Sequence, residues 1–338
     1  MNAFPPSADR SVGRGHGPGG LLSVVIPCHD EAAVIDNTHA RLTAALPGTG
    51  MDFEIIYVDD GSRDDTLGRL EAIAARDARV TVVVFSRNFG QQAAMSAGLS
   101  LARGDAIVIT DADLQDPPEV IPDMVRAWRS GVDVAYGRRR RRAGETAFKL
   151  VTASLYHRLF ASLMPYPMPV DTGDFKLLDR AVADAVRALP EKHRYLRSLV
   201  PWAGFRHEPV WYDREPRAAG ETKYSPWKLL KLACDALVLS SDAPLRFSWL
   251  AAGSLIGVGL MATGVATASS SWGPPRESIS LAAFTAIATF VAAVPTAAVA
   301  VVGEYVARVY REVQGRPTWV IRRTIGRGAE IHSGNRAA

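Results

Sequence analysis

The sequence has few cysteines and no apolar segment near its first residues. Cys28 and Cys234 are its two cysteines, and they lie far apart in unlike surroundings. This pattern argues against a disulfide framework or a cysteine zinc site and is typical of a reducing compartment. Residues 1–20 are rich in Gly and Pro and lack the apolar core of a signal peptide. We interpret them as a disordered leader.

Strong net charge is also missing. The 39 Lys and Arg residues against 35 Asp and Glu residues leave a net charge of +4, which is too small to indicate a nucleic-acid partner. Gly15, Gly17 and Gly20 have the spacing of a dinucleotide-binding loop, but the first predicted strand follows them instead of preceding them. The sequence therefore argues against a nicotinamide dehydrogenase.

From residue 21 onwards, short apolar runs alternate with helical patterns. Strands are predicted at 21–27, 53–58, 80–85 and 105–110, and helices at 31–46, 61–76 and 90–102. Ser62 and Asp65 form a capping pattern for the second helix. Strands that are apolar on both faces and joined by helices predict an α/β domain with a mostly parallel sheet. We assign residues 21–224 to this domain.

Four of these predicted strands end in polar clusters. The clusters are PCHDE at 27–31, DDGS at 59–62, SRNFG at 86–90 and DADLQ at 111–115. Ligands of parallel sheets bind at the carboxyl ends of the strands. An isolated Asp-x-Asp is usually a solvated turn, but here the four clusters converge on one edge. The oxygens of Asp111, Asp113 and Gln115 are hard ligands that suit Mg²⁺ or Mn²⁺.

The last third of the chain contains two long stretches without charge, at 247–275 and 278–303. Each exceeds the roughly 20 residues that a membrane-spanning helix needs. We predict transmembrane helices at 247–270 and 279–303. Lys and Arg residues flank the pair, whereas the linker contains Arg276, which places the α/β domain and both termini in the cytoplasm. Two buried helices of a globular protein are the alternative.

Further segments of the sequence suit a membrane surface. Residues 225–243 predict an interfacial helix with Trp and Lys at headgroup level. The apolar stripe in 145–163 fits either an interfacial or a core-packed helix. Residues 304–338 are predicted to form a basic cytoplasmic tail. Gly253 and Gly257 allow close helix packing within the hairpin or between copies, so the sequence leaves a homo-oligomer open.

Six motifs, in this order along the chain, resemble the family 2 glycosyltransferases of GT-A fold. They are VVIPCHDE, VDDGSRDDT, SRNFG, DADLQDPPE, GDFKLLDR and GETKY. Together with the two predicted spans, they are similar to the polyprenyl-phosphate glycosyltransferases, the group of dolichyl-phosphate mannose synthases and bactoprenol glucosyltransferases. The sequence contains no Gln-x-x-Arg-Trp motif, which argues against a processive polysaccharide synthase.

The resemblance implies roles for individual residues. The implied donor-binding residues are Pro27, Glu31, Asp59, Asp60, Asp111 and Arg217, and the implied metal ligands are Asp111, Asp113 and Gln115. Capping of the following helix is the structural alternative for Asp59 and Asp60, but Ser62 is predicted to supply that cap. The implied cofactor is Mg²⁺ or Mn²⁺.

On the acceptor side, the resemblance assigns the phosphate to Arg139, Lys149 and Lys223, and catalysis to Asp113, Asp171 and Asp174. Most other arginines of the run at 138–142 are predicted to serve the membrane surface. A phosphate acceptor is already largely ionised at neutral pH. We therefore predict that Asp174 orients groups in the site more than it removes a proton.

The implied reaction transfers one hexose, with inversion, from a nucleotide sugar to undecaprenyl or another polyprenyl phosphate at the cytoplasmic membrane. UDP-glucose is the first expected donor, followed by GDP-mannose and a UDP-aminopentose. A non-catalytic, membrane-anchored sensor or scaffold that binds a nucleotide sugar is the alternative from another class.

Overall fold

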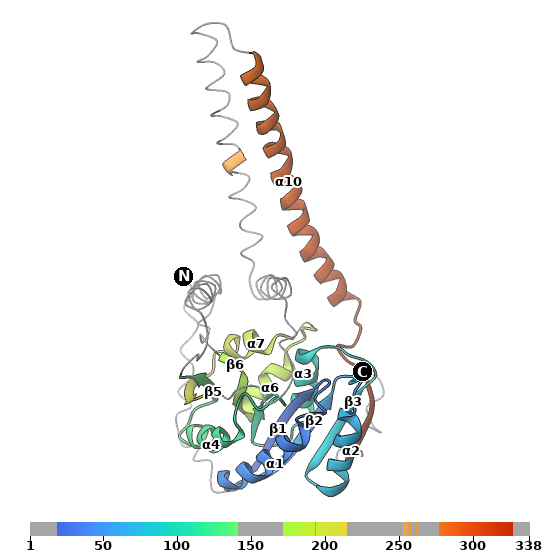
Figure 1. Cartoon of the computed structure of the whole chain (residues 1–338). Coiled ribbons are helices and arrows are strands. Elements are labelled where there is room, and N and C mark those ends of the chain that lie inside the picture. The colour runs from blue at the N-terminus through green and yellow to red at the C-terminus, as the bar shows by residue number, and fades with distance from the viewer. Residues whose placement is uncertain are drawn as a thin grey trace. The chain divides into compact units, whose positions relative to one another are not determined.

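The computed structural model describes residues 19–140, 172–192, 194–214 and 277–326, together with a few helical residues between 253 and 261. The chain divides into two compact units. The first consists of 1–161, 166–223 and 317–338, and the second of 162–165 and 224–316. The first unit is built around a β-sheet and the second contains a long helix (Figure 1).

An eight-stranded sheet forms the centre of the first unit, in the order β7-β5-β6-β4-β1-β2-β3-β8. The strands are β1 (Leu21–Cys28), β2 (Asp52–Asp59), β3 (Val80–Phe85), β4 (Ala106–Ile109), β5 (Val134–Arg139), β6 (Thr172–Asp179), β7 (His207–Tyr212) and β8 (Ile321–Gly326). The central strands β4, β1, β2 and β3 are parallel, whereas β6 and β8 run antiparallel to their neighbours. The predicted mostly parallel sheet is confirmed.

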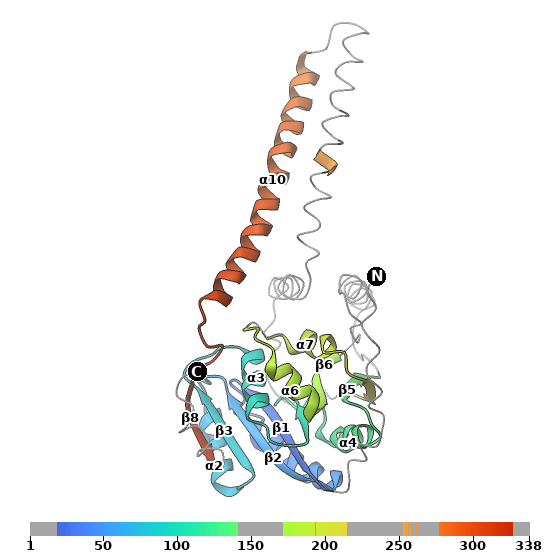
Figure 2. The ribbon, with the colours of Figure 1, turned by 180° about the vertical axis from the view of Figure 1, so that it is seen from behind.

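Helices cover both faces of the sheet (Figures 1 and 2). The helices α1 (Ile35–Ala45), α2 (Thr66–Arg76) and α4 (Ile121–Arg129) pack on one face, and α3 (Gln91–Leu101), α6 (Arg180–Ala188) and α7 (Leu196–Trp202) on the other. Successive strand residues alternate between the two cores: Val24 belongs to the first and Val25 to the second. Because both faces are buried, the strands read as continuous apolar runs.

The start of α2 differs from the prediction. The helix begins at Thr66, whose backbone N–H donates to the Asp64 carboxylate at 3.0 Å. The Ser62 hydroxyl instead accepts from the backbone N–H of Asp30 at 3.1 Å. The predicted Ser62 cap is therefore wrong, because the loop after β1 uses that hydroxyl.

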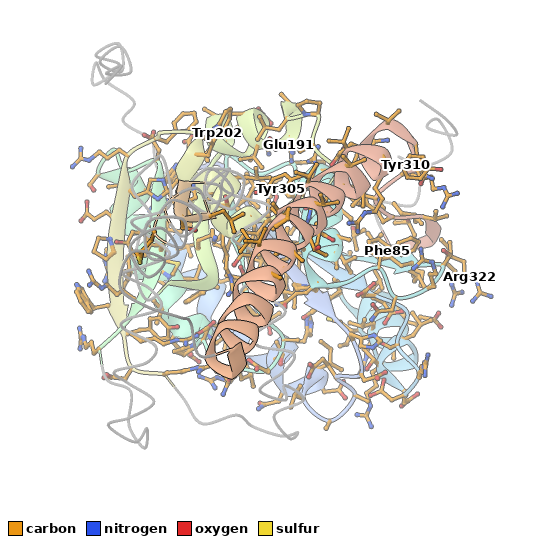
Figure 3. The ribbon with its side chains drawn as sticks, turned by 90° about the horizontal axis from the view of Figure 1, so that it is seen from above. Phe85, Glu191, Trp202, Tyr305, Tyr310 and Arg322 are labelled. Atoms are coloured by element: carbon orange, nitrogen blue, oxygen red, sulfur yellow. The ribbon has the colours of Figure 1, made fainter. Side chains whose placement is uncertain are left out.

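The segment 304–338, predicted as a basic tail, also differs. Its first part continues a helix, and β8 pairs antiparallel with β3 at the edge of the sheet. The Trp319 ring stacks on Phe85, with centroids 6.4 Å apart and planes 11° from parallel. Phe85 and Arg322 lie on these neighbouring strands at the same edge (Figure 3). The strand at 321–326 was not predicted because Arg322 and Arg323 interrupt its apolar residues.

The second unit contains α10 (Glu277–Val313), a helix of 37 residues and about 55 Å in length. Among the described residues it is the one helix that is long and apolar enough to cross a membrane, over Val291–Val313 with a mean hydropathy of 1.3. It overlaps the predicted second span. Most of the predicted first span, 247–270, lies outside the described residues, so the two-helix hairpin is not confirmed. The predicted interfacial helices at 145–163 and 225–243 also lie outside them.

A buried carboxylate ties the amino-terminal ends of the central strands together. Glu54 is 6% exposed and accepts from the Ser23 hydroxyl at 2.6 Å, the Arg103 backbone N–H at 2.8 Å and Arg103 Nε at 3.0 Å. Burial by itself would raise the pKa of Glu54, but the hydrogen bonds from Ser23 and Arg103 outweigh it and lower the pKa. Glu54 therefore stabilises the folded chain as a carboxylate.

We expect Glu54→Gln to lower the free energy of unfolding by about 2 kcal/mol at neutral pH, because Arg103 and Ser23 lose a charged acceptor. Since the pKa of Glu54 is lowered on folding, its contribution is complete above the unfolded value of about 4.3 and is lost as the pH falls through the folded value. Unfolding of the two proteins should therefore converge in acid. Glu119→Gln, at an exposed pair with Arg41, is the control and should change little. A difference between wild type and Glu54→Gln that stays constant down to about pH 3 would contradict the assignment.

Candidate active site

The loops that follow β1 and β2 are joined by hydrogen bonds. The Arg63 backbone N–H donates to Asp30 Oδ1 at 2.7 Å, and the Glu31 N–H donates to Thr66 Oγ1 at 2.8 Å. Pro27 is buried in β1 opposite Val58. The structure thus brings two of the clusters predicted to bind the donor side by side at the carboxyl edge of the sheet.

Both aspartates of the DDGS motif are buried and accept hydrogen bonds from backbone N–H groups. Asp60 accepts from the N–H groups of Phe89 at 2.6 Å and Gly90 at 2.9 Å, and Asp59 accepts from the Ser62 N–H at 3.3 Å. Burial raises the pKa of each carboxyl. These contacts hold the loop 86–90 against β2, so Asp60 has a structural role that the sequence did not indicate.

A left-handed residue shapes the DADLQ turn. Leu114 is buried and has a φ of 59°, a conformation that is unfavourable for a side chain with a Cβ. The Gln115 N–H donates to Asp113 Oδ1 at 3.1 Å, and Thr38 Oγ1 donates to the Ala112 carbonyl at 2.6 Å. One hydrogen bond within the turn and one from Thr38 of α1 therefore stabilise this strained conformation.

Negative charge is concentrated around Asp111. Burial and, to a smaller extent, the nearby carboxylates of Asp174, Asp116 and Asp113 together raise its pKa to about 7. Carboxylate oxygens in such a set are hard ligands, and a divalent cation would offset their mutual repulsion. The donor chemistry therefore fits Mg²⁺ or Mn²⁺.

The predicted metal ligands are in one turn but are not arranged as a closed shell. The described part of the chain holds no group of three or more His, Cys, Asp or Glu side chains placed to bind a metal ion. Asp111 Oδ1 accepts from Gln91 Nε2 at 2.7 Å, and Gln115 Oε1 accepts from Arg214. Sites for Mg²⁺ commonly use one or two carboxylates and complete their shell with water and substrate phosphates. Asp111 and Asp113 can supply these two.

Asp174 forms a buried ion pair that the sequence did not reveal. Its side chain is 1% exposed and accepts from Arg197 Nε at 2.8 Å and from Arg197 Nη2 at 2.7 Å. Burial would raise the pKa of Asp174, but the hydrogen bonds and charge of Arg197 hold it below the usual value. Asp174 is thus an ionised carboxylate that accepts two hydrogen bonds from one guanidinium. No motif contains Arg197, which comes from α7.

Arg139 is directed toward the carboxylates by two other residues. Its Nε donates to the Tyr212 hydroxyl at 3.3 Å, and its Nη2 lies 3.7 Å from Asp116 Oδ1. Tyr212 in turn donates to Asp116, which is buried. A Cβ at Gly173 would lie 3.3 Å from the same guanidinium, so the glycine lets β6 approach it closely. Arg138 instead stacks over Trp211 at 4.6 Å.

Four predicted site residues lie outside the described residues: Lys149, Asp171, Arg217 and Lys223. Their assigned roles stay predictions. Gln91, Gln92, Arg197 and Tyr212 are the contributors that sequence reasoning missed. The glutamines follow the SRNFG cluster directly, so their place at a strand end was a signal that could have found them.

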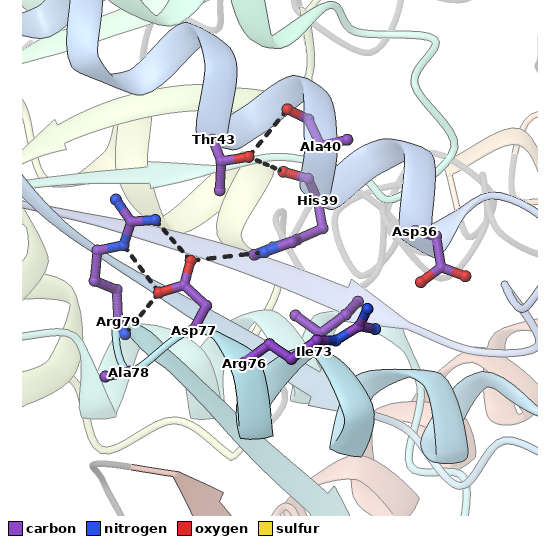
Figure 4. Close-up of a pocket in the computed structure, with 9 residues that line it drawn as sticks. All are labelled: Asp36, His39, Ala40, Thr43, Ile73, Arg76, Asp77, Ala78 and Arg79. Carbon is purple, nitrogen blue, oxygen red and sulfur yellow. Dashed lines mark hydrogen bonds and ion pairs between the residues drawn. The ribbon is translucent and has the colours of Figure 1, made fainter.

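A pocket of about 510 Å³ lies elsewhere in this unit, between α1 and the turn from α2 to β3 (Figure 4). His39 Nε2 lies 3.6 Å from Asp77 Oδ2 there, and Asp77 also pairs with Arg79 at 2.8 Å. Residues 76–79 precede β3, whereas Asp111 follows β4 at the carboxyl edge. The pocket is therefore separate from the carboxylate cluster.

Sequence comparison establishes the family. The model of glycosyl transferase family 2 matches residues 23–187. The uncharacterized glycosyltransferase YkcC of Bacillus subtilis is 38% identical over 310 residues, covering 90% of this chain and 94% of that protein. The bactoprenol glucosyl transferase of Shigella phage SfII is 31% identical over 316 residues, covering 90% and 98%. The chain belongs to glycosyl transferase family 2, and it is a glycosyltransferase.

Comparison with solved structures matches part of this chain to the glucosyl-3-phosphoglycerate synthase of Mycobacterium tuberculosis in complex with Mn²⁺, UDP-glucose and phosphoglyceric acid. It is 21% identical, with a TM-score of 0.48, over 65% of this chain and 78% of that one.

We expect Arg197→Met to destabilise the protein by about 3 kcal/mol, because it leaves the Asp174 carboxylate buried without its partner. Adding Asp174→Asn to this variant should recover part of the loss, since the unpaired charge is then removed. Thermal or denaturant unfolding of both single variants and the double variant measures the coupling. Arg126→Met, at an exposed pair with Asp123, is the control. Strictly additive losses from the two substitutions would disprove a coupled pair.

Proposed function

We propose that this glycosyltransferase moves one hexose from a nucleotide sugar to the phosphate of a polyprenyl phosphate, with inversion in a single displacement. Relatives named bactoprenol glucosyl transferase match about nine-tenths of the chain, which supports a polyprenyl-phosphate acceptor. UDP-glucose is the first proposed donor, ahead of GDP-mannose and a UDP-aminopentose.

The carboxylate cluster at the strand ends is the observation that carries the proposal. Asp111 and Asp113, with Gln115, would hold Mg²⁺ or Mn²⁺, which when bound offsets charge on the departing diphosphate. Asp59, Asp60 and Glu31 lie at the adjoining edge, beside β1 and β2. We assign the nucleoside to this region, where Glu31 can accept hydrogen bonds and Asp60 fixes the loop 86–90.

Arg139 is the proposed contact for the acceptor phosphate. Its guanidinium faces the carboxylate cluster beside Asp116, and a guanidinium can bind a phosphate in bidentate fashion. Asp174 is held as an ion pair with a lowered pKa, which makes it a weak base. A phosphate acceptor needs no strong base because it is already ionised at neutral pH. The lowered pKa of Asp174 is therefore consistent with an acceptor that needs no general base.

We place the reaction at the cytoplasmic membrane face. The apolar helix α10 is long enough to cross a bilayer, and the distribution of Lys and Arg supports cytoplasmic placement of the catalytic unit and both termini. The first span, 247–270, completes the proposed anchor.

We expect the purified full chain to transfer labelled sugar into butanol-extractable lipid when given undecaprenyl phosphate and Mg²⁺ or Mn²⁺. Undecaprenol without phosphate should accept nothing, because its un-ionised hydroxyl replaces the phosphate oxygen that attacks the sugar. Asp113→Ala should lower the rate at least 100-fold, whereas Asp123→Ala, on the exposed face of α4, should not. Full activity in excess chelator would contradict the assignment of Asp111, Asp113 and Gln115 to a metal site. Donor binding without transfer from any nucleotide sugar would favour the sensor.

We expect Asp174→Asn to lower turnover without changing the shape of the pH–rate profile. The pKa of Asp174 lies below its usual value, so this residue does not titrate between about pH 6 and 9. Rates measured across that range, for wild type and variant at saturating acceptor, provide the comparison. Loss of an ascending limb in the variant would identify Asp174 as a base.

A further inference from the structure

The start of α3 is joined to four of the other elements that build the site. Asp60, just after β2, accepts from the N–H of Gly90, the residue that precedes α3. Gln91 donates to Asp111, which follows β4. Gln92 contacts Asp174 on β6 and the start of α7. Neither Gln91 nor Gln92 has a role in the proposed function.

Gln91 orients one oxygen of Asp111. Its Nε2 donates to Asp111 Oδ1 at 2.7 Å, which restricts rotation of the carboxylate. The amide is neutral, so it orients the group without cancelling its charge. The second oxygen of the carboxylate is not part of this contact, so Oδ2 can face a divalent cation while Oδ1 is held in place.

Gln92 connects two parts of the opposite side of the site. Its Oε1 accepts from the Leu196 N–H at 2.9 Å, at the first residue of α7. Because the preceding Tyr195 makes no side-chain cap, Gln92 satisfies an N–H that the helix leaves without an internal partner. The Gln92 side chain also lies beside Asp174 and helps to lower the pKa of that carboxyl. One amide thus holds both Asp174 and the helix that carries Arg197.

The helix that presents these glutamines is closely packed on the sheet. Residues Ala93 to Leu99 are buried, and a Cβ at Gly98 would overlap the Val25 side chain. Small side chains let α3 lie directly on β1 and β2, which limits movement of its first turn. The positions of Gln91 and Gln92 are therefore determined by the core.

We propose that Gln91 and Gln92 are positioning residues with separate tasks: Gln91 sets the Asp111 carboxylate for the divalent cation, and Gln92 sets Asp174 together with the start of α7. The assignment rests on the proposed function, because it takes Asp111 as a metal ligand. It predicts that the two substitutions separate metal binding from turnover.

The first test is direct binding of Mn²⁺, in the presence of UDP, to the full chain in detergent, read by the spin resonance of free Mn²⁺. Gln91→Met should raise the dissociation constant about tenfold, whereas Gln92→Met and the exposed control Gln314→Met should leave it unchanged. Equal Mn²⁺ affinity in wild type and Gln91→Met would overturn the assignment of Gln91 alone. A wild type that binds no Mn²⁺ would overturn the metal site of the proposed function, and Gln91 with it.

The second test separates the two contacts of Gln92 by steady-state kinetics. Gln92→Met loses both contacts, and Gln92→Glu keeps an acceptor for the Leu196 N–H but places a carboxylate against Asp174. Both variants should lower kcat about tenfold or more with little change in the KM for donor. Normal kcat in Gln92→Glu would overturn the Asp174 contact. Normal kcat in both variants, with normal thermal unfolding, would overturn the role of Gln92.

Discussion

Negative charge gathered at the carboxyl ends of the parallel strands is the constraint on which the site depends. Asp111, Asp113, Asp116 and Asp174 come close enough together to raise the pKa of Asp111 to about 7, after burial has made the larger contribution. The protein balances Asp174 with Arg197 and Asp116 with Arg139. Asp111 instead accepts a hydrogen bond from the neutral amide of Gln91. The uneven balance leaves the Asp111 side of the cluster suited to a cation from outside the chain.

The edge that carries these carboxylates is held by segments distant in the sequence. Asp60 fixes the loop 86–90 through two backbone N–H groups, and Ser86 in that loop donates to the Val320 carbonyl at 2.9 Å. Trp319 stacks on Phe85 just before β8 completes the sheet. The chain beyond the apolar helix therefore supports the loop that leads into α3. Residues 317–326, which the sequence suggested were part of a tail, therefore belong to the catalytic unit.

The fold was predictable where burial imposes a simple pattern. The strands from β1 to β4 are apolar on both faces because helices cover both sides, so they stood out as short runs. β8 did not, because Arg322 and Arg323 interrupt its apolar residues and lie on an edge strand where charge is tolerated. The start of α2 was misplaced because Ser62 could serve either a helix or a loop, and the local sequence does not distinguish these uses.

The sequence by itself determined which side chains reach the edge of the sheet, because the carboxyl ends of neighbouring parallel strands meet there whatever the loops do. Asp111, Asp113 and the DDGS motif were placed correctly for that reason. Only the tertiary structure decided which carboxylates of the cluster are paired with an arginine and which accept from a neutral group. Arg197, Tyr212 and Gln92 come from elements whose approach depends on packing against the whole sheet, and no local spacing encodes such contacts.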